Sequence, residues 1–232
     1  MKVHLTLFSR MLPLYHGPTI KIRINADNTE ITISRNLLCR ASPVFTKMFY
    51  NGHFKESQEQ VLDLEDMDGV ISSRALDAFI QWLYRGTINF DIKSTEEKIP
   101  AAMELVRFAD MYNVDELEAK MARYIKEILA SAKPPYENYG LNQNTHFLKS
   151  DHIISALNLP RGHAVRRLLA AASVEGYLKG DKYKFADLAQ DYTSYGADLL
   201  QECSWHCAGC SEKMYVWRTP STERNSAYLQ NK

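Results

Sequence analysis

The residues with the clearest potential for chemistry lie close together near the C-terminal end of the sequence. Three cysteines and one histidine fall within eight residues, at Cys203, His206, Cys207 and Cys210. Thiolates and an imidazole suit tetrahedral zinc. Four ligands from one short stretch would be strained, however, because structural zinc sites usually combine two separated pairs. We expect reduced thiols without metal, and a zinc site or a redox-active Cys207/Cys210 pair are the alternatives.

The other histidines show no catalytic spacing. None is four residues from another and no His-Glu-x-x-His pattern occurs; they are His4, His16, His53, His146, His152 and His163. The sequence also lacks a glycine-rich phosphate loop, a nucleophile elbow and a kinase motif set. Arg161, Arg166 and Arg167 form a small basic cluster, which is more typical of a solvated helix face than of a phosphate site. The sequence therefore predicts no enzyme and no cofactor.

The composition predicts a folded globular protein of one or two domains. Of 232 residues, 45% are hydrophobic and 24% are charged, which is ordinary for globular proteins. Lys plus Arg and Asp plus Glu each number 28, so the formal net charge is zero. Neither nucleic acid nor an anionic membrane is an expected partner, because no excess of positive charge would attract one.

The apolar runs and the cysteines predict an intracellular, soluble protein. The first ten residues hold an apolar run too short for a secretory signal, and no stretch has 18 uncharged apolar residues in a row. Cys39 stands apart from the three clustered cysteines, so the spacing is unlike a secreted disulfide framework. Reduced thiols fit the cytoplasm or the nucleus, where we expect the protein to be.

The first part of the sequence mixes strand and helix patterns. Residues 19–24 alternate apolar and polar types, and residues 30–33 return as the second strand of a hairpin. Residues from 37 onward have helical spacing, with Ser42-Pro43 as a break between two short helices. A third strand is expected at 59–64. Further helices are expected at 70–83, which Gly86 ends, from Pro100 to residue 112, and from residue 115 to Pro134.

A change of composition marks the domain boundary. Residues 133–149 are rich in Asn, Gly and Tyr and predict a linker. Helical patterns resume at residues 150–158, 163–177 and 182–203. We therefore expect five parts, namely an N-terminal helical segment at 1–17, an α+β domain at 18–132, the linker, an all-helical extension at 150–210, and a flexible tail at 211–232.

Four segments, in order, resemble the BTB/POZ family. They are NLLCRASPVF at 36–45, FKES at 54–57, FIQWLYRG at 79–86 and LVRFADMYNVDEL at 105–117. The resemblance covers residues 18–130 and implies a small mixed sheet flanked by a cluster of helices, acting in protein–protein interaction. The extension is similar to the tails of filamentous-fungal BTB proteins through VRRLL at 165–169 and DLL at 198–200.

The sequence departs from the BTB proteins that repress transcription. In those proteins an Asp in the first strand and a basic residue after the second strand form a charged pocket near the dimer interface. Lys21 and Arg35 stand at these positions, and Ser34 replaces the histidine before the basic residue. Two like charges cannot make that pair, so we expect no repressor-type pocket.

The resemblance also implies two partner-binding sites. Phe54 and Glu56 match the hydrophobic-x-Glu signature with which many BTB adaptors dock onto a cullin scaffold; the alternative is that Phe54 tucks under its loop and Glu56 is merely solvated. BTB domains commonly pair through an N-terminal helix and strand. The matching stripe is Leu5, Phe8, Leu12 and Tyr15, whose apolar residues need a cover from a second copy or from the same chain.

The sequence thus predicts a BTB/POZ interaction module that forms a homodimer and recruits partners, with a cullin-type ubiquitin ligase and an unnamed client as the partners considered first. One alternative is an oligomerisation domain in a transcriptional or cytoskeletal complex without a cullin. A second, from another class, is a small zinc or redox protein centred on Cys203 to Cys210.

Overall fold

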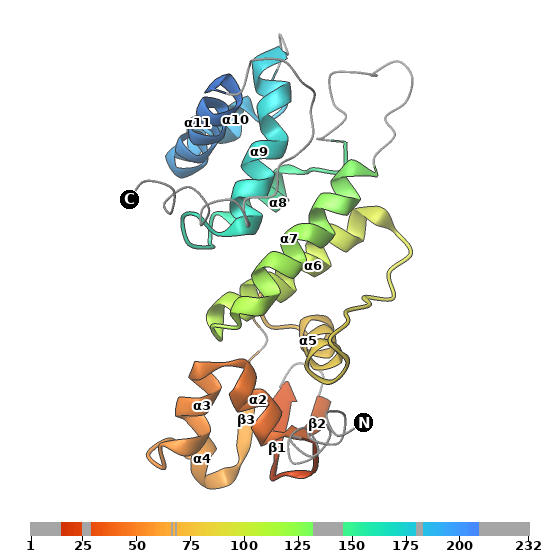
Figure 1. The fold of residues 1–232 in the computed structure, drawn as a ribbon, viewed down its shortest axis with the longest axis vertical. Helices are drawn as coiled ribbons and strands as arrows, with labels where there is room; N and C mark the ends of the chain where they lie inside the picture. The colour runs from red at the N-terminus through yellow and green to blue at the C-terminus, as the bar shows by residue number, and fades with distance from the viewer. Residues whose placement is uncertain are drawn as a thin grey trace, which may run out of the picture.

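The computed structural model describes residues 15–24, 29–65, 67, 69–131, 146–179 and 183–208, without the side chains of residues 29, 175, 179 and 206–208. The molecule is elongated (Figure 1), with the sheet at one end, the helices α6 and α7 in the middle and the helices α8 to α11 at the other end. The predicted N-terminal segment lies outside the described residues up to residue 14, as do residues 132–145 of the linker and the tail from 209.

The sheet has three strands in the order β2-β1-β3. Strand β1 (Thr19–Ile24) pairs antiparallel with β2 (Thr29–Ser34) and parallel with β3 (Val61–Leu64). Every second residue of β1 is buried, because alternate side chains of a strand point to opposite faces. The predicted hairpin is confirmed, and the mixed three-stranded sheet with its helices confirms the predicted α+β class.

Two short helices follow the hairpin, α2 (Arg35–Ala41) and α3 (Pro43–Tyr50). Ser42 separates them as predicted: its Oγ accepts hydrogen bonds from the backbone N–H groups of Val44 and Phe45, each at 3.1 Å. The same hydroxyl donates to the backbone carbonyl of Tyr112. A further helix, α4 (Lys55–Glu59), was not predicted, and it delays the third strand from residue 59 to Val61.

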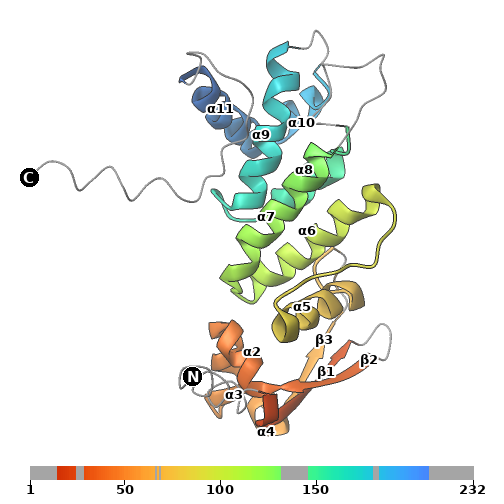
Figure 2. The ribbon, with the colours of Figure 1, turned by 45° about the vertical axis from the view of Figure 1, so that its right-hand side comes forward.

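Helix α5 (Ser73–Arg85) lies between the sheet and α6 in both ribbon views (Figures 1 and 2). It starts three residues later than expected, after the N-cap Ser72, and ends as predicted at Gly86, whose φ is +70°. Aromatic rings join it to its neighbours. The ring of Phe79 is 5.1 Å from that of Phe108, and Phe45 stacks on Tyr112 at 4.5 Å. These rings form the centre of the domain core.

Helices α6 (Thr95–Met111) and α7 (Asp115–Ala130) form the middle layer. The expectation that Pro100 opens the first of them is wrong, since α6 begins five residues earlier and contains the proline. Glu96 and Glu97 in the first turn favour this earlier start, because carboxylates stabilise the positive end of the helix dipole.

The extension is helical, as predicted, and comprises α8 (Ser150–Ala156), α9 (Ala164–Lys179), α10 (Ala186–Asp191) and α11 (Thr193–Ala208). The single helix expected at 182–203 is in fact two, which separate at Tyr192. Helix α8 packs on α6, and α9 packs between α7 and α11. One continuous set of buried side chains runs from Ile20 in the sheet to Tyr195 in α11, so the extension shares the core of the domain.

Candidate partner-binding surface

Phe54 lies on the connection between α3 and α4 and is 47% exposed. The turn is held by Ser57, whose backbone N–H donates to the Phe54 carbonyl and whose hydroxyl donates to the Phe49 carbonyl, both at 3.1 Å. These bonds fix the backbone on both sides of the phenylalanine. Phe54 is therefore not tucked under its loop, which was the alternative.

Glu56 lies two residues further along, in the first turn of α4, and its side chain is half-buried. Its backbone carbonyl accepts from the Gln60 N–H at 2.9 Å, which closes the short helix. On the same helix, Lys55 and Glu59 form an exposed ion pair at 3.6 Å. Glu56 and Phe54 therefore belong to one hydrogen-bonded turn at the molecular surface.

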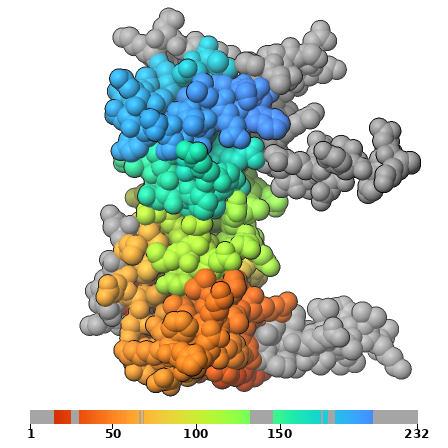
Figure 3. Space-filling model, turned by 90° about the vertical axis from the view of Figure 1, so that its left-hand side faces the viewer, coloured from red at the N-terminus to blue at the C-terminus, as the bar shows by residue number. Residues whose placement is uncertain are grey.

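Another exposed aromatic side chain, on the neighbouring helix, was missed by sequence reasoning. Tyr50 ends α3 four residues before Phe54 and is 54% exposed. Its hydroxyl donates to Asn36 Oδ1 at 3.1 Å, and the guanidinium of Arg35 lies 4.9 Å from the ring centroid. The signal was its position outside the buried stripe that Phe45 and Phe49 define on α3. Phe54 and Glu56 are hereafter the α3–α4 surface; the part of the sequence to which they belong is orange in Figure 3.

Only one member of the predicted dimer stripe is described. Leu5, Phe8 and Leu12 lie outside the described residues. The ring of Tyr15 lies 6.0 Å from that of Tyr84 in α5, and Tyr15 is 39% exposed. Tyr84 in turn accepts a 2.9 Å hydrogen bond from the Ser34 backbone N–H through its hydroxyl oxygen. Tyr15, the last residue of the stripe, thus packs against α5 and remains partly exposed.

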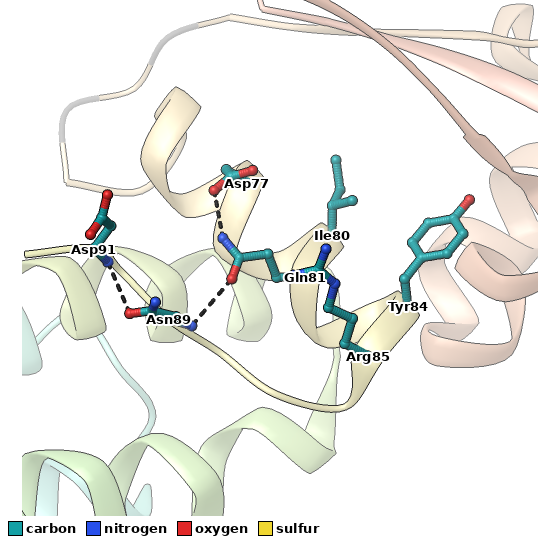
Figure 4. Close-up of a pocket in the computed structure, with 7 residues that line it drawn as sticks. All are labelled: Asp77, Ile80, Gln81, Tyr84, Arg85, Asn89 and Asp91. Carbon is teal, nitrogen blue, oxygen red and sulfur yellow. Dashed lines mark hydrogen bonds between the residues drawn. The ribbon is translucent and has the colours of Figure 1, made fainter.

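A shallow hollow lies between α5 and the segment that follows it (Figure 4). Its lining residues are Asp77, Ile80, Gln81, Tyr84, Arg85, Asn89 and Asp91. Gln81 Nε2 donates to Asp77 Oδ2 at 2.7 Å, Gln81 Oε1 accepts from the Asn89 N–H at 3.3 Å, and Asn89 Oδ1 accepts from the Asp91 N–H at 3.1 Å. These bonds tie the segment to the helix, so the polar lining holds the backbone in place.

The two basic residues at the repressor-pocket positions have other partners. Lys21 projects from the solvent face of β1 and forms an ion pair with Glu30 of β2 at 2.8 Å. Arg35 Nη1 donates to Gln60 Oε1 at 3.2 Å. Each of the two side chains is thus engaged with a neighbour in the fold.

The Cys/His cluster can be placed only in part. Cys203, His206 and Cys207 belong to α11, where Cys203 is buried against Val174 and Leu199. The side chains of His206 and Cys207, and all of Cys210, lie outside the description. Among the side chains that are described, His, Cys, Asp and Glu do not gather in any group of three or more suited to a metal. The described helices also include none with the length and apolar character to cross a bilayer.

Two of the three clustered arginines do not lie on the solvated face that we expected, although Arg161 is exposed. Arg166 has a side chain only 5% exposed, and its Nε donates to Asp198 Oδ2 at 2.5 Å. Arg167 pairs with Glu202 at 3.1 Å. Both carboxylates come from α11, so these arginines join two helices of the extension.

A small mixed sheet and a cluster of helices surround a closed core, and side chains such as Phe54 are exposed at the surface. The family model of the BTB/POZ domain matches residues 16–129, from just before β1 to near the end of α7. The chain is therefore a BTB/POZ domain-containing protein, as the four sequence segments predicted. A comparison with curated proteins gave no match.

Membership in this family fixes the function at a general level. BTB/POZ domains are protein–protein interaction modules, and in general they act by self-association and by binding partners rather than as enzymes. The function of this chain is accordingly to bind other proteins.

Proposed function

We propose that this BTB/POZ protein is a substrate adaptor of a cullin-type ubiquitin ligase, and that Phe54 and Glu56 contact the cullin. The observation that carries the proposal is the 47% exposure of Phe54 on a hydrogen-bonded turn that also holds Glu56. A large aromatic residue that is exposed on a soluble domain, beside a carboxylate, has the composition of an interface anchor with its polar orienting group.

The physical roles of the two residues differ. Burial of the exposed part of the Phe54 ring would supply apolar area, and aromatic anchors of this kind commonly contribute about 2 kcal/mol or more to binding. Glu56 would accept hydrogen bonds from the cullin and set the orientation of the anchor.

The other parts of the chain have roles within this proposal. Self-association through the stripe of Leu5, Phe8, Leu12 and Tyr15 would bring two adaptors together. The extension shares the core of the BTB domain, so it would hold a client at a fixed distance from the α3–α4 surface. The client itself is an unnamed protein.

The test measures the binding of a purified cullin to the full chain, either by isothermal titration calorimetry or with a biosensor on which one of the two proteins is immobilised. Phe54→Ala is expected to weaken binding about thirtyfold, the equivalent of about 2 kcal/mol. Glu56→Ala should weaken it less. The matched control is Glu59→Ala, since Glu59 is a glutamate on the same short helix whose side chain is exposed and paired with Lys55.

The same measurement separates the alternatives. Failure of the wild-type chain to bind any cullin, with self-association intact, would favour an oligomerisation domain in a transcriptional or cytoskeletal complex. Binding that Phe54→Ala and Glu56→Ala leave unchanged would place the contact elsewhere on the molecule and reject the α3–α4 surface.

A further inference from the structure

Helix α4, which directly follows Phe54, depends on hydrogen bonds for its position. It has five residues, Lys55–Glu59, and none of these five is buried. An isolated helix of this length is not stable in water. Ser57 ties it to α3 through the Phe49 carbonyl, and Gln58 Nε2 donates to the Gly52 carbonyl at 3.4 Å. The orientation of the α3–α4 surface therefore depends on polar contacts at the base of this segment.

Gln60, the C-cap of α4, has a backbone conformation that is unusual for its residue type. Its φ is +56° and its ψ is 36°, a left-handed conformation that favours glycine over residues with a Cβ. The side chain makes contacts that glycine could not make. Its Oε1 accepts from Arg35 Nη1 at 3.2 Å, and its Nε2 donates to the Ser57 carbonyl at 2.6 Å. The Gln60 carbonyl also accepts from the Lys21 backbone N–H at 3.0 Å, which joins the end of α4 to the sheet.

Arg35, the first residue of α2, reaches both ends of the segment that carries the α3–α4 surface. Its guanidinium lies 4.9 Å from the ring centroid of Tyr50, the last residue of α3, and donates to Gln60 after α4. The neighbouring Asn36 accepts from the Tyr50 hydroxyl at 3.1 Å. Helix α2 lies beside α3, and α3 beside α4, at the sheet end of the molecule (Figure 1). One guanidinium thus joins the two points between which residues 51–59 leave and rejoin the fold.

We propose that the contact of Arg35 with Gln60 is a positioning device, which closes the base of residues 51–59 and holds Phe54 and Glu56 in the orientation that binds a partner. Neither Arg35 nor Gln60 has to touch the partner. An anchor that is already held in its bound orientation loses less conformational freedom on binding, so affinity rises without any new contact. This inference rests on the proposed function of the α3–α4 surface.

The first test measures cullin binding to the full chain. Gln60→Ala removes both side-chain bonds of Gln60, so it should weaken binding about tenfold. In a Phe54→Ala background the same replacement should weaken binding much less, by about threefold at most, because it acts through the orientation of Phe54. A tenfold loss in both backgrounds would overturn the positioning role. The matched control is Gln58→Ala, an exposed glutamine of the same helix, which should change affinity by less than about twofold.

The second test needs no cullin. Hydrogen–deuterium exchange of the full chain, followed by mass spectrometry, should show that Gln60→Ala accelerates amide exchange in residues 51–60 about tenfold and leaves exchange in α5 unchanged. Unchanged exchange in residues 51–60 would overturn the proposal whatever the affinity. If the wild-type chain binds no cullin, the adaptor proposal fails, and exchange still decides whether Gln60 holds the segment.

Gln60→Gly is the second variant, for use if Gln60→Ala does not fold. Glycine relaxes the left-handed backbone while it removes the same side-chain bonds. This variant should retain its midpoint in urea unfolding but bind cullin about tenfold more weakly and exchange faster in residues 51–60. Wild-type affinity together with wild-type exchange in this variant would show that the backbone alone positions the α3–α4 surface.

Discussion

Glu118 of α7 accepts a hydrogen bond from the backbone N–H of Ala164, the first residue of α9, with its Oε1 2.6 Å from the nitrogen. The first N–H groups of a helix have no partner inside the helix, and its N-terminus favours negative charge. A carboxylate of the BTB domain thus caps a helix of the extension. This bond fixes where α9 begins relative to the domain.

Glu118→Ala should destabilise the folded chain by about 1 to 2 kcal/mol, because the Ala164 N–H loses its acceptor. Glu118→Gln should cost less, since the amide oxygen still accepts a bond although the charge is lost. Urea unfolding measures both. Glu116→Ala is the control, because Glu116 is an exposed glutamate of the same helix. Equal stabilities for the Glu116 and Glu118 variants would contradict the capping role.

The Ser42 hydroxyl serves two parts of the domain, as the cap of α3 and as the donor to the Tyr112 carbonyl. Ser42 is 1% exposed, so water cannot readily replace these bonds. Ser42→Ala should therefore reduce the free energy of unfolding by about 2 to 3 kcal/mol. Ser94 is the matched control: it stands at the N-cap of α6 without a side-chain cap bond, so Ser94→Ala should change stability little. A similar loss in both variants would contradict this account.

The local elements could be predicted where the sequence signal is local. Strand β1 is encoded by alternation of isoleucine with polar residues, and the α2–α3 break by Ser42-Pro43. Helix α4 was missed because its five residues, KESQE, are too few and too polar to show an apolar stripe. Pro100 was misleading, because a proline marks the first turn of a helix only as a tendency.

The sites were harder to predict from the sequence, because the residues that contact one another there are far apart in the chain. Phe54 and Glu56 were found through a motif, but the exposure of Phe54 depends on how Ser57 anchors the turn to Phe49. The basic cluster was misjudged, since the carboxylates that pair with Arg166 and Arg167 lie 32 and 35 residues further along. No periodicity in α9 predicts which residues of α11 will face it.

His152 makes stability depend on pH. Burial, with smaller contributions from Lys149 and Lys184, lowers the pKa of His152 to about 4 from an ordinary value of 6.5, and its Nδ1 accepts from the Lys149 N–H at 3.2 Å. The folded state therefore binds this proton less readily than the unfolded state does. The resulting stability is full above about pH 6.5 and is lost progressively as the pH falls towards 4, by up to about 3 kcal/mol.

His152→Asn should flatten this dependence, because the amide oxygen can accept the same bond without titrating. Denaturant unfolding at intervals between neutral pH and the acid limit measures it. His163, whose pKa is also lowered by burial, contributes in the same direction, so the variant retains part of the slope. A slope identical to that of the wild type would show that His152 gains a proton without cost to the fold.

The Arg166–Asp198 pair should be the most sensitive contact of the extension. Arg166 also donates through Nη1 to the Leu157 and Leu159 carbonyls, at 3.3 and 2.9 Å, so three segments meet at one guanidinium. Arg166→Ala should lower the free energy of unfolding by about 3 to 5 kcal/mol, because the carboxylate of Asp198 would remain largely shielded from water without its partner. Replacing both residues, as Arg166→Met with Asp198→Leu, should recover much of that loss, since apolar side chains of similar size fill the space without a charge to desolvate. Arg161→Ala, at an exposed position, is the control in chemical denaturation. If the double variant were as unstable as Arg166→Ala, the contribution of Arg166 would lie in its bonds to the two carbonyls and not in the ion pair.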